Sequence, residues 1–153
     1  MIIRQKTNCC CESNNFIKLE SPRSKKPKKL IIEWKRLVND GKTCFRCGNT
    51  EVELDKGIEI VRNCAKNLNI EVEVVKSEIS LEEFRKNPLI SNQIMINGKL
   101  LEEWLNASTG SSLCCDVCES NECRTIQIDG KIYETITREL IIKGSLIAMT
   151  HIL

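Results

Sequence analysis

The sequence predicts an α/β domain over residues 29–153, with a central sheet of about four strands flanked by helices. The apolar run Leu30–Trp34 is rich in strand-forming residues, and apolar residues then recur every three or four positions from Leu54 to Leu68. Ile70–Val75 alternates and is β-branched. A strand, a helix and a strand in this order favour two parallel strands with a right-handed crossover.

The composition is that of a soluble, globular chain. It has 153 residues, of which 41% are hydrophobic and 29% charged. No secretory signal and no run of about 18 apolar residues is present, so we expect a cytoplasmic protein without a membrane partner. In a reducing compartment, 10 cysteines point to metal binding or redox chemistry rather than to permanent disulfides. The single histidine, His151, stands near the C-terminus, which argues against histidine-dependent catalysis.

Residues 1–28 are expected to form a weakly ordered basic arm that contains cysteines. Residues 1–36 carry ten Lys/Arg and three Asp/Glu, but no aromatic residues interleave with the lysines to stack on bases. A solvated linker therefore fits better than a nucleic-acid partner. The run Cys9-Cys10-Cys11 can wrap a soft metal ion or consist of incidental thiols, and both interpretations stay open.

The first half of the domain contains the predicted strand–helix–strand unit. We expect a strand over 30–38 and a helix over 50–68, with Thr50 and Glu53 as a capping box. Cys64 falls near the apolar face of this helix and is expected to be buried as a small hydrophobe.

The second half alternates short elements and turns. Ser80 and Glu83 form a second capping box, and Asn97-Gly98 and Asp129-Gly130 are hairpin turns. The predicted elements are a short helix over 80–86 stopped by Pro88, a strand over 93–98, a hairpin partner or helix over 100–105, a hairpin over 125–134 and a C-terminal helix over 137–153.

Cys44 and Cys47 precede the first long helix. A helix N-terminus favours a thiolate, which is the reactive and metal-binding form of cysteine. If the two cysteines act as a catalytic pair, we expect Cys44 to be the exposed attacking thiolate and Cys47 the resolving thiol. Arg46 and the helix start are expected to lower the pKa of Cys44.

The densest thiol group comprises Cys114, Cys115, Cys118 and Cys123. Thiolates select soft ions such as mercury, arsenite or copper(I). Adjacent cysteines diverge and fit low-coordinate ions better than a tetrahedral zinc, so we predict a soft-metal site here. Four thiols within ten residues also raise the effective ligand concentration.

A structural zinc module without catalysis, acting as an interaction domain, is the alternative. Cys-x-x-Cys followed by Gly48 has the shape of a zinc knuckle. Cys44 and Cys47 together with Cys115 and Cys118 would then close a four-thiolate site. The expected cofactor is accordingly a thiolate-bound ion, either zinc or a soft heavy metal.

The chain resembles an uncharacterised cysteine-rich, thioredoxin-like family, a "domain of unknown function" of archaea and anaerobic bacteria. The resemblance is carried by Ile32-Glu33-Trp34, Thr43-Cys44 to Cys47-Gly48, Pro88 to Asn92, Ile96-Asn97-Gly98, Leu101-Glu102, Cys114-Cys115 to Cys118 and Glu122 to Thr125. It implies a thioredoxin-like core and a thiol role, such as handling mercury or arsenic.

Two departures from thioredoxins bear on this expectation. Asn92-Gln93 stands where thioredoxins place a cis-proline, and Phe45-Arg46 stands between the paired cysteines. Both argue against ordinary disulfide exchange. Thiol-based redox chemistry, soft-metal binding or transfer remain the expected functions, with a thiol/disulfide or metal-donor protein as partner.

Overall fold

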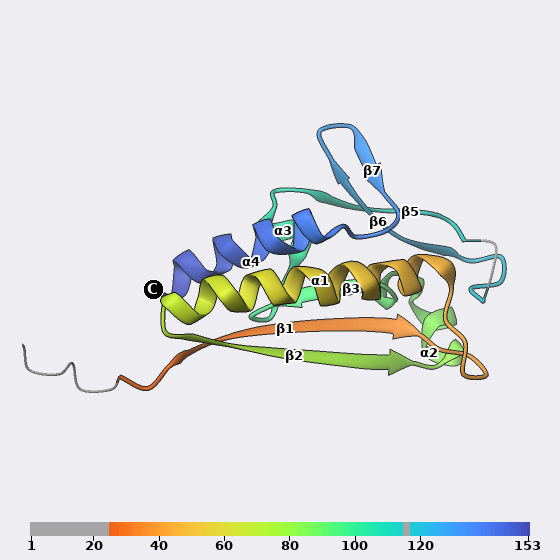
Figure 1. Cartoon of the computed structure of the whole chain (residues 1–153). Coiled ribbons are helices and arrows are strands. Elements are labelled where there is room, and N and C mark those ends of the chain that lie inside the picture. Colours follow the sequence, from red (N-terminus) through yellow and green to blue (C-terminus); the bar gives the residue numbers. More distant parts are fainter. Residues whose placement is uncertain (1–24, 115–116) are drawn as a thin grey trace, which may run out of the picture.

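The computed structural model describes residues 25–114 and 117–153, and within these ranges the strands form two sheets (Figure 1). In the first sheet, of order β2-β1-β3-β4, β1 and β2 are parallel, whereas β3 is antiparallel to both β1 and β4. Its strands are β1 (Lys28–Leu37), β2 (Ile70–Ile79), β3 (Gln93–Ile96) and β4 (Lys99–Leu100).

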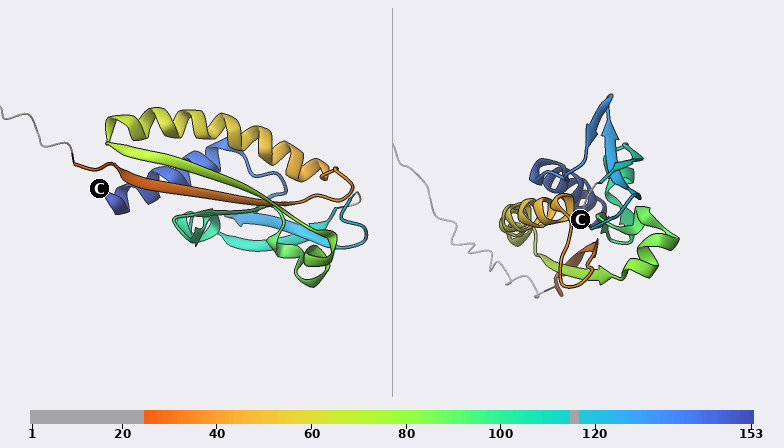
Figure 2. Two further views of the ribbon diagram at one scale, coloured as in Figure 1. Left: turned by 90° about the horizontal axis from the view of Figure 1, so that it is seen from below. Right: turned by 90° about the vertical axis from the view of Figure 1, so that its right-hand side faces the viewer.

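β1 lies between β2 and β3, and the apolar residues on one of its faces are fully buried. Leu30, Ile32 and Trp34 share one face of the strand and are each 0% exposed. The helix α1 (Phe45–Asn67) connects β1 to β2 and buries Leu54, Ile58, Val61 and Ala65. It runs along the sheet beside α4 (Arg138–Ile152), as Figure 1 and the end view in Figure 2 show.

The second sheet has the order β5-β6-β7 and is antiparallel throughout. Its strands are β5 (Ser108–Leu113), β6 (Glu122–Ile128) and β7 (Lys131–Tyr133). The short helices α2 (Leu81–Lys86) and α3 (Leu101–Trp104) and the 3-10 turn η1 (Pro88–Ile90) connect the parts.

The α/β prediction is confirmed, including the sheet of four strands, the flanking helices and the hairpin–helix extension. The parallel β1–α1–β2 unit, the Ser80/Glu83 capping box and the Asn97-Gly98 turn are found as expected. β5 is an additional strand. Its sequence, rich in Ser, Thr and Gly, has no apolar alternation, so its strand conformation comes from pairing with β6.

The predicted start of the first helix is wrong. α1 begins at Phe45, and Cys44 is its N-cap, whereas the sequence interpretation began the helix at Thr50. The Thr50 hydroxyl instead accepts a hydrogen bond from the backbone N–H of Ile136, and Glu53 pairs with Arg138. Long-range partners thus replace the local capping box. Gly48 lies inside α1 and not in a turn before it. The zinc-knuckle alternative therefore loses the support that it drew from Gly48.

The predicted burial of Cys64 is also wrong, because its side chain is exposed. Successive helical residues are about 100° apart around the axis. Cys64 is one position from Ala65, which is 0% exposed, and therefore points to the edge of the apolar stripe. Leu68 is the C-cap of α1 and is 42% exposed, because the helix ends one residue before it.

Residues 1–24, including Cys9-Cys10-Cys11, lie outside the described residues, as does nearly all of the predicted arm. Among the helices in the described part of the chain, none is both long enough and apolar enough to cross a membrane.

Candidate thiol site

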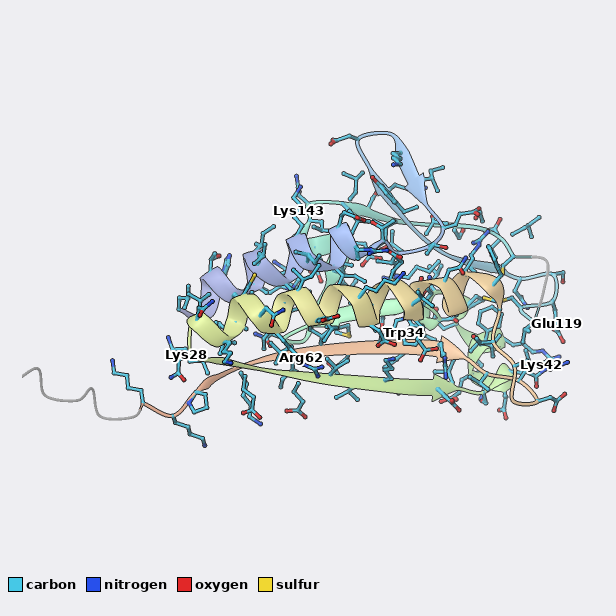
Figure 3. All side chains as sticks on the ribbon, in the orientation of Figure 1. Lys28, Trp34, Lys42, Arg62, Glu119 and Lys143 are labelled. Carbon is cyan, nitrogen blue, oxygen red and sulfur yellow. The ribbon has the colours of Figure 1, made fainter. Side chains whose placement is uncertain are left out.

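The site forms where two connections, β1–α1 and β5–β6, meet at one end of the molecule. Cys44 follows β1 and begins α1, Cys114 follows β5, and Cys118 and Cys123 flank the turn that leads into β6. Figure 3 shows Lys42 and Glu119, which lie on these two connections, at the end of the molecule opposite Lys28. This is the C-terminal end of the parallel strands β1 and β2.

Three thiols are close enough to share one ion. The Sγ atoms of Cys44, Cys114 and Cys118 lie within 4.8 Å of one another, and all three side chains are buried. Cys123 makes hydrogen-bond contacts with Cys44 and Cys118, and Cys47 makes one with Cys44. The thiol cluster, as we call these five cysteines, therefore joins residues separated by most of the domain.

A tight turn brings Cys118 and Cys123 back to the same place. The Cys118 carbonyl accepts hydrogen bonds from both the backbone N–H and the side-chain amide of Asn121. Glu119 adopts a left-handed conformation, with φ of 57°. Its carboxylate also pairs with Arg85 of α2 at 2.7 Å. The turn is thus stabilised by its own hydrogen bonds and by the ion pair between Glu119 and Arg85 of α2.

Arg46 connects the two sides of the cluster. Its guanidinium donates to the carbonyls of Ser112 and Leu113 at 3.2 and 2.6 Å, and to the Glu134 carboxylate at 2.9 Å. The Arg46 side chain is 7% exposed. Leu113 is the last residue of β5 and directly precedes Cys114. By binding its carbonyl, Arg46 of α1 holds the end of β5 and so positions Cys114.

A second buried arginine stabilises the strand that carries Cys123. Arg124 donates to the Glu102 carboxylate at 2.8 Å and to the carbonyl of Leu89. The side chains of Arg124 and Glu102 are 4% and 3% exposed. Their pairing holds β6 against α3 and η1, and hence holds Cys123 at the cluster.

The pKa values of the five thiols are not all shifted in the same direction. Hydrogen bonds from Cys118, Cys123 and Cys47 hold the pKa of Cys44 far below its usual value. The Cys44 side chain makes no capping hydrogen bond to α1, but the backbone N–H of Cys47 is near enough to contribute to that lowering. Among the five cysteines of the cluster, Cys44 is thus the one whose pKa is lowered.

The pKa of each of the other four thiols is raised. The hydrogen bond to Cys44 and burial raise the pKa of Cys47, and the bond to Cys123 and that to Cys44 raise the pKa of Cys118. Burial raises the pKa of Cys114. The pKa of Cys123 is lowered by its bond to Cys118, but the bond to Cys44 and burial outweigh this and raise it overall.

Ser91 completes the surroundings of Cys47. Its Oγ lies 3.6 Å from Cys47 Sγ and accepts a hydrogen bond from the backbone N–H of Leu37 at 3.0 Å. Asn92, in a left-handed conformation with φ of 59°, accepts from the Trp34 indole. No cis peptide bond occurs in residues 25–114 and 117–153. The segment before β3 therefore faces the cysteine pair with a hydroxyl.

The structure places both predicted sets of cysteines in one site. The preferred prediction has a catalytic pair, Cys44 and Cys47, and a separate metal site that includes Cys114, Cys118 and Cys123, whereas the zinc alternative joins Cys44 and Cys47 to Cys115 and Cys118. The prediction that Cys44 is exposed is wrong, because Cys44 and Cys47 are each 1% exposed. Arg46 is not among the groups that lower the pKa of Cys44.

Cys115 lies outside the described residues, and its predicted ligand role stays a prediction. The sequence interpretation missed Ser91 as a neighbour of Cys47. Its place just before the third strand, where thioredoxins carry their cis-proline, was the signal that could have indicated it.

The sequence of the chain matches a family described as "Domain of unknown function (DUF2703)" over residues 30–145. The chain belongs to this family. The matched range contains every member of the thiol cluster and excludes Cys9-Cys10-Cys11. The DUF2703 region and the folded part that carries the site thus coincide.

One relative matches this chain over a stretch about as long as the family region. An "Uncharacterized protein" of Archaeoglobus fulgidus is 38% identical over 112 residues, which cover 73% of this chain and 82% of the relative. No solved structure matches the chain.

Proposed function

We propose that this protein binds a thiophilic metal ion through Cys44, Cys114 and Cys118, with Cys123 as a fourth donor. The observation that carries the proposal is the mutual proximity of three buried sulfurs within 4.8 Å. A zinc–thiolate bond of about 2.3 Å in tetrahedral geometry places sulfurs roughly 3.8 Å apart. Small side-chain adjustments would therefore bring the three thiols around one ion.

The chemistry of the donors favours soft ions. Within the described residues, no histidine or carboxylate joins the group, and thiolates select ions such as zinc, copper(I), mercury(II) or arsenite. Three sulfurs suit a trigonal ion, and Cys123 supplies the fourth ligand that a tetrahedral ion needs. A bound cation would also compensate thiolate charge that burial disfavours.

The scaffold is consistent with a thioredoxin-like thiol protein. The strand order β2-β1-β3-β4, with β1 and β2 parallel, places a dithiol at the start of α1. Metal binding or transfer by this dithiol together with the second sheet is the function that this arrangement supports best.

An anaerobic titration tests the proposal. The full chain, with Cys9, Cys10 and Cys11 changed to Ser, would be titrated with zinc(II) against a chromophoric chelator and separately with arsenite. We expect one ion per chain, and at least about tenfold weaker binding for Cys114→Ser and for Cys118→Ser. The exposed Cys64→Ser is the matched control and should bind as the parent does. Unchanged affinity in both site variants, with a normal circular dichroism spectrum, would contradict the proposal.

A structural zinc site is the second candidate, favoured by the burial of all the donors. Such a site contributes directly to folding free energy. Thermal unfolding separates the two functions. A melting temperature that falls by tens of degrees after chelation indicates a structural ion, whereas a fall of a few degrees indicates an ion that the protein carries.

A further inference from the structure

Cys44 belongs to two groups of thiols at once. Its Sγ lies within 4.8 Å of those of Cys114 and Cys118, and as the N-cap of α1 it also stands one helical turn before Cys47. Cys47 stands outside the group of three and faces Ser91 instead. The Cys44 sulfur can therefore coordinate an ion or form a bond with Cys47, but a disulfide sulfur no longer serves as a thiolate ligand.

We propose that the Cys44–Cys47 dithiol reduces a hydroperoxide, and that the disulfide so formed weakens metal binding by withdrawing Cys44 from the ion. The second part rests on the proposed function above. The peroxide reaction itself requires only the two thiols and would stand without a bound ion.

The reaction balances in two steps. The Cys44 thiolate attacks the peroxide oxygen that carries hydrogen, the O–O bond breaks, and the alkoxide, or hydroxide from hydrogen peroxide, leaves and takes up the proton that the Cys44 thiol released on ionising. Cys44 is then a sulfenic acid. The Cys47 sulfur attacks the Cys44 sulfur, the S–O bond breaks, and the hydroxyl leaves as water with the Cys47 proton. The two thiols lose two electrons, which reduce the peroxide.

Burial favours a small oxidant over a protein disulfide. Cys44 and Cys47 are each 1% exposed, so the sulfur of a partner protein could not reach them without opening of the fold. A hydroperoxide is only slightly larger than a water molecule when its substituent is hydrogen. The N-terminus of α1 favours the attacking thiolate at Cys44, because helix N-termini stabilise negative charge.

Ser91 holds the resolving thiol. Its hydroxyl oxygen accepts from the Leu37 N–H, which leaves the hydroxyl hydrogen free to donate toward Cys47 Sγ at 3.6 Å. Cys47 is thereby kept beside Cys44 and away from the ion-binding sulfurs. Once Cys44 is oxidised, the ion retains Cys114, Cys118 and Cys123, and we expect its affinity to fall at least about tenfold.

The test uses the full chain with zinc(II) bound, and hydrogen peroxide as the probe. Zinc release is followed with a chromophoric chelator, and disulfides are mapped by mass spectrometry. We expect one Cys44–Cys47 disulfide per released zinc, and recovery of zinc binding after treatment with a thiol reductant. Cys47→Ser should bind zinc as the wild type does, but peroxide should leave it with a Cys44 sulfenic acid, trapped by dimedone, in place of the Cys44–Cys47 disulfide. Cys64→Ser is the control and should behave as the wild type.

The outcomes separate the two proposals. The absence of a Cys44 sulfenic acid in Cys47→Ser, or a disulfide between other cysteines in the wild type, would overturn the inference. Failure of the reduced wild type to bind zinc would refute the proposed function and with it the coupling to metal. In that case a Cys44–Cys47 disulfide would still support the peroxide reaction, and a different pair would reject it.

Discussion

Arg46 illustrates how a single side chain can assemble a site without serving as a ligand. It stands between Cys44 and Cys47 in the sequence, yet its guanidinium reaches the end of β5 and the Glu134 carboxylate. Planar arginine can satisfy several acceptors at once, which a lysine ammonium does with less geometric control. Its role is to position Cys114 relative to Cys44.

Changing Arg46→Gln should therefore affect both stability and binding. Two carbonyls lose charged donors, and we expect unfolding to become easier by about 1–3 kcal/mol. Zinc affinity should fall as well, because the end of β5 is released. Chemical denaturation and the chelator titration measure the two effects. Arg62→Gln, on the exposed side of α1, is the matched control and should stay within about 0.5 kcal/mol of wild type.

Thiol reactivity should follow exposure. Among the described cysteines, Cys64 is exposed, whereas Cys44, Cys47, Cys114, Cys118 and Cys123 are buried. Alkylation of the folded, ion-free protein with iodoacetamide, mapped by mass spectrometry, should therefore label Cys64 before Cys44, despite the thiolate character of Cys44. Faster labelling of Cys44 would mean that the cluster opens readily in solution.

At the scale of elements, the packing of α4 against α3 depends on Gly144. A Cβ atom at Gly144 would lie 2.3 Å from the Leu101 side chain, which is itself 0% exposed. Glycine inside a helix normally weakens it. In the structure it permits the close approach of two helices.

The substitution Gly144→Ala should thus destabilise the fold, by about 1–3 kcal/mol from overpacking. Gly48→Ala is an informative control, because Gly48 is also helical but has nothing within 4 Å of an added Cβ. That change should be neutral or stabilising by up to about 1 kcal/mol. Urea unfolding of both variants gives the comparison, and equal losses in the two would contradict the packing argument.

Elements specified by local signals were predicted well. Ser80 and Glu83 bond to each other's backbone groups within one turn, and Asn97-Gly98 supplies the positive φ values of its hairpin turn, 49° and 75°. Neither needs information from elsewhere in the chain. The sequence was accordingly sufficient for the helix α2 and the β3–β4 hairpin.

Features that depend on distant partners were missed. Thr50 has the sequence context of an N-cap, but its hydroxyl is taken by Ile136, 86 residues away. β5 lacks an apolar pattern and exists through its pairing with β6. The proximity of Cys44 to Cys114 and Cys118 likewise depends on contacts between distant parts of the chain. Spacing left open whether the two thiol groups are separate or joined, and the folded chain brings Cys44 together with Cys114 and Cys118.

At the scale of the whole molecule, Glu53 and Arg138 connect the first helix to the last. The guanidinium and backbone N–H of Arg138 donate to the Glu53 carboxylate at 2.9–3.0 Å. These hydrogen bonds lower the pKa of Glu53 from 4.5 to about 2. A carboxyl whose pKa is lower in the folded state stabilises the fold above its unfolded pKa, and this stabilisation is lost as pH falls toward the folded value.

We therefore expect a stability difference between wild type and Glu53→Gln that is full at pH 6 and shrinks progressively between about pH 5 and pH 2. Thermal unfolding across this pH range measures it. Glu59→Gln, which changes an exposed residue of the same helix, should show no such trend. A difference that persisted undiminished at pH 2 would mean that the ion pair is not its source.

The division of the thiol cluster between two sheets also governs when the site can exist during protein synthesis. Cys44 leaves the ribosome 70 residues before Cys114, which at about 5–20 residues per second is an interval of roughly 4–14 seconds. The β1–α1–β2 unit is then already available, with its dithiol still lacking the partners that bury it. During this interval the nascent chain exposes the Cys44 and Cys47 thiols to metal and oxidant, so the order of translation makes the reducing capacity of the surroundings a condition for correct assembly.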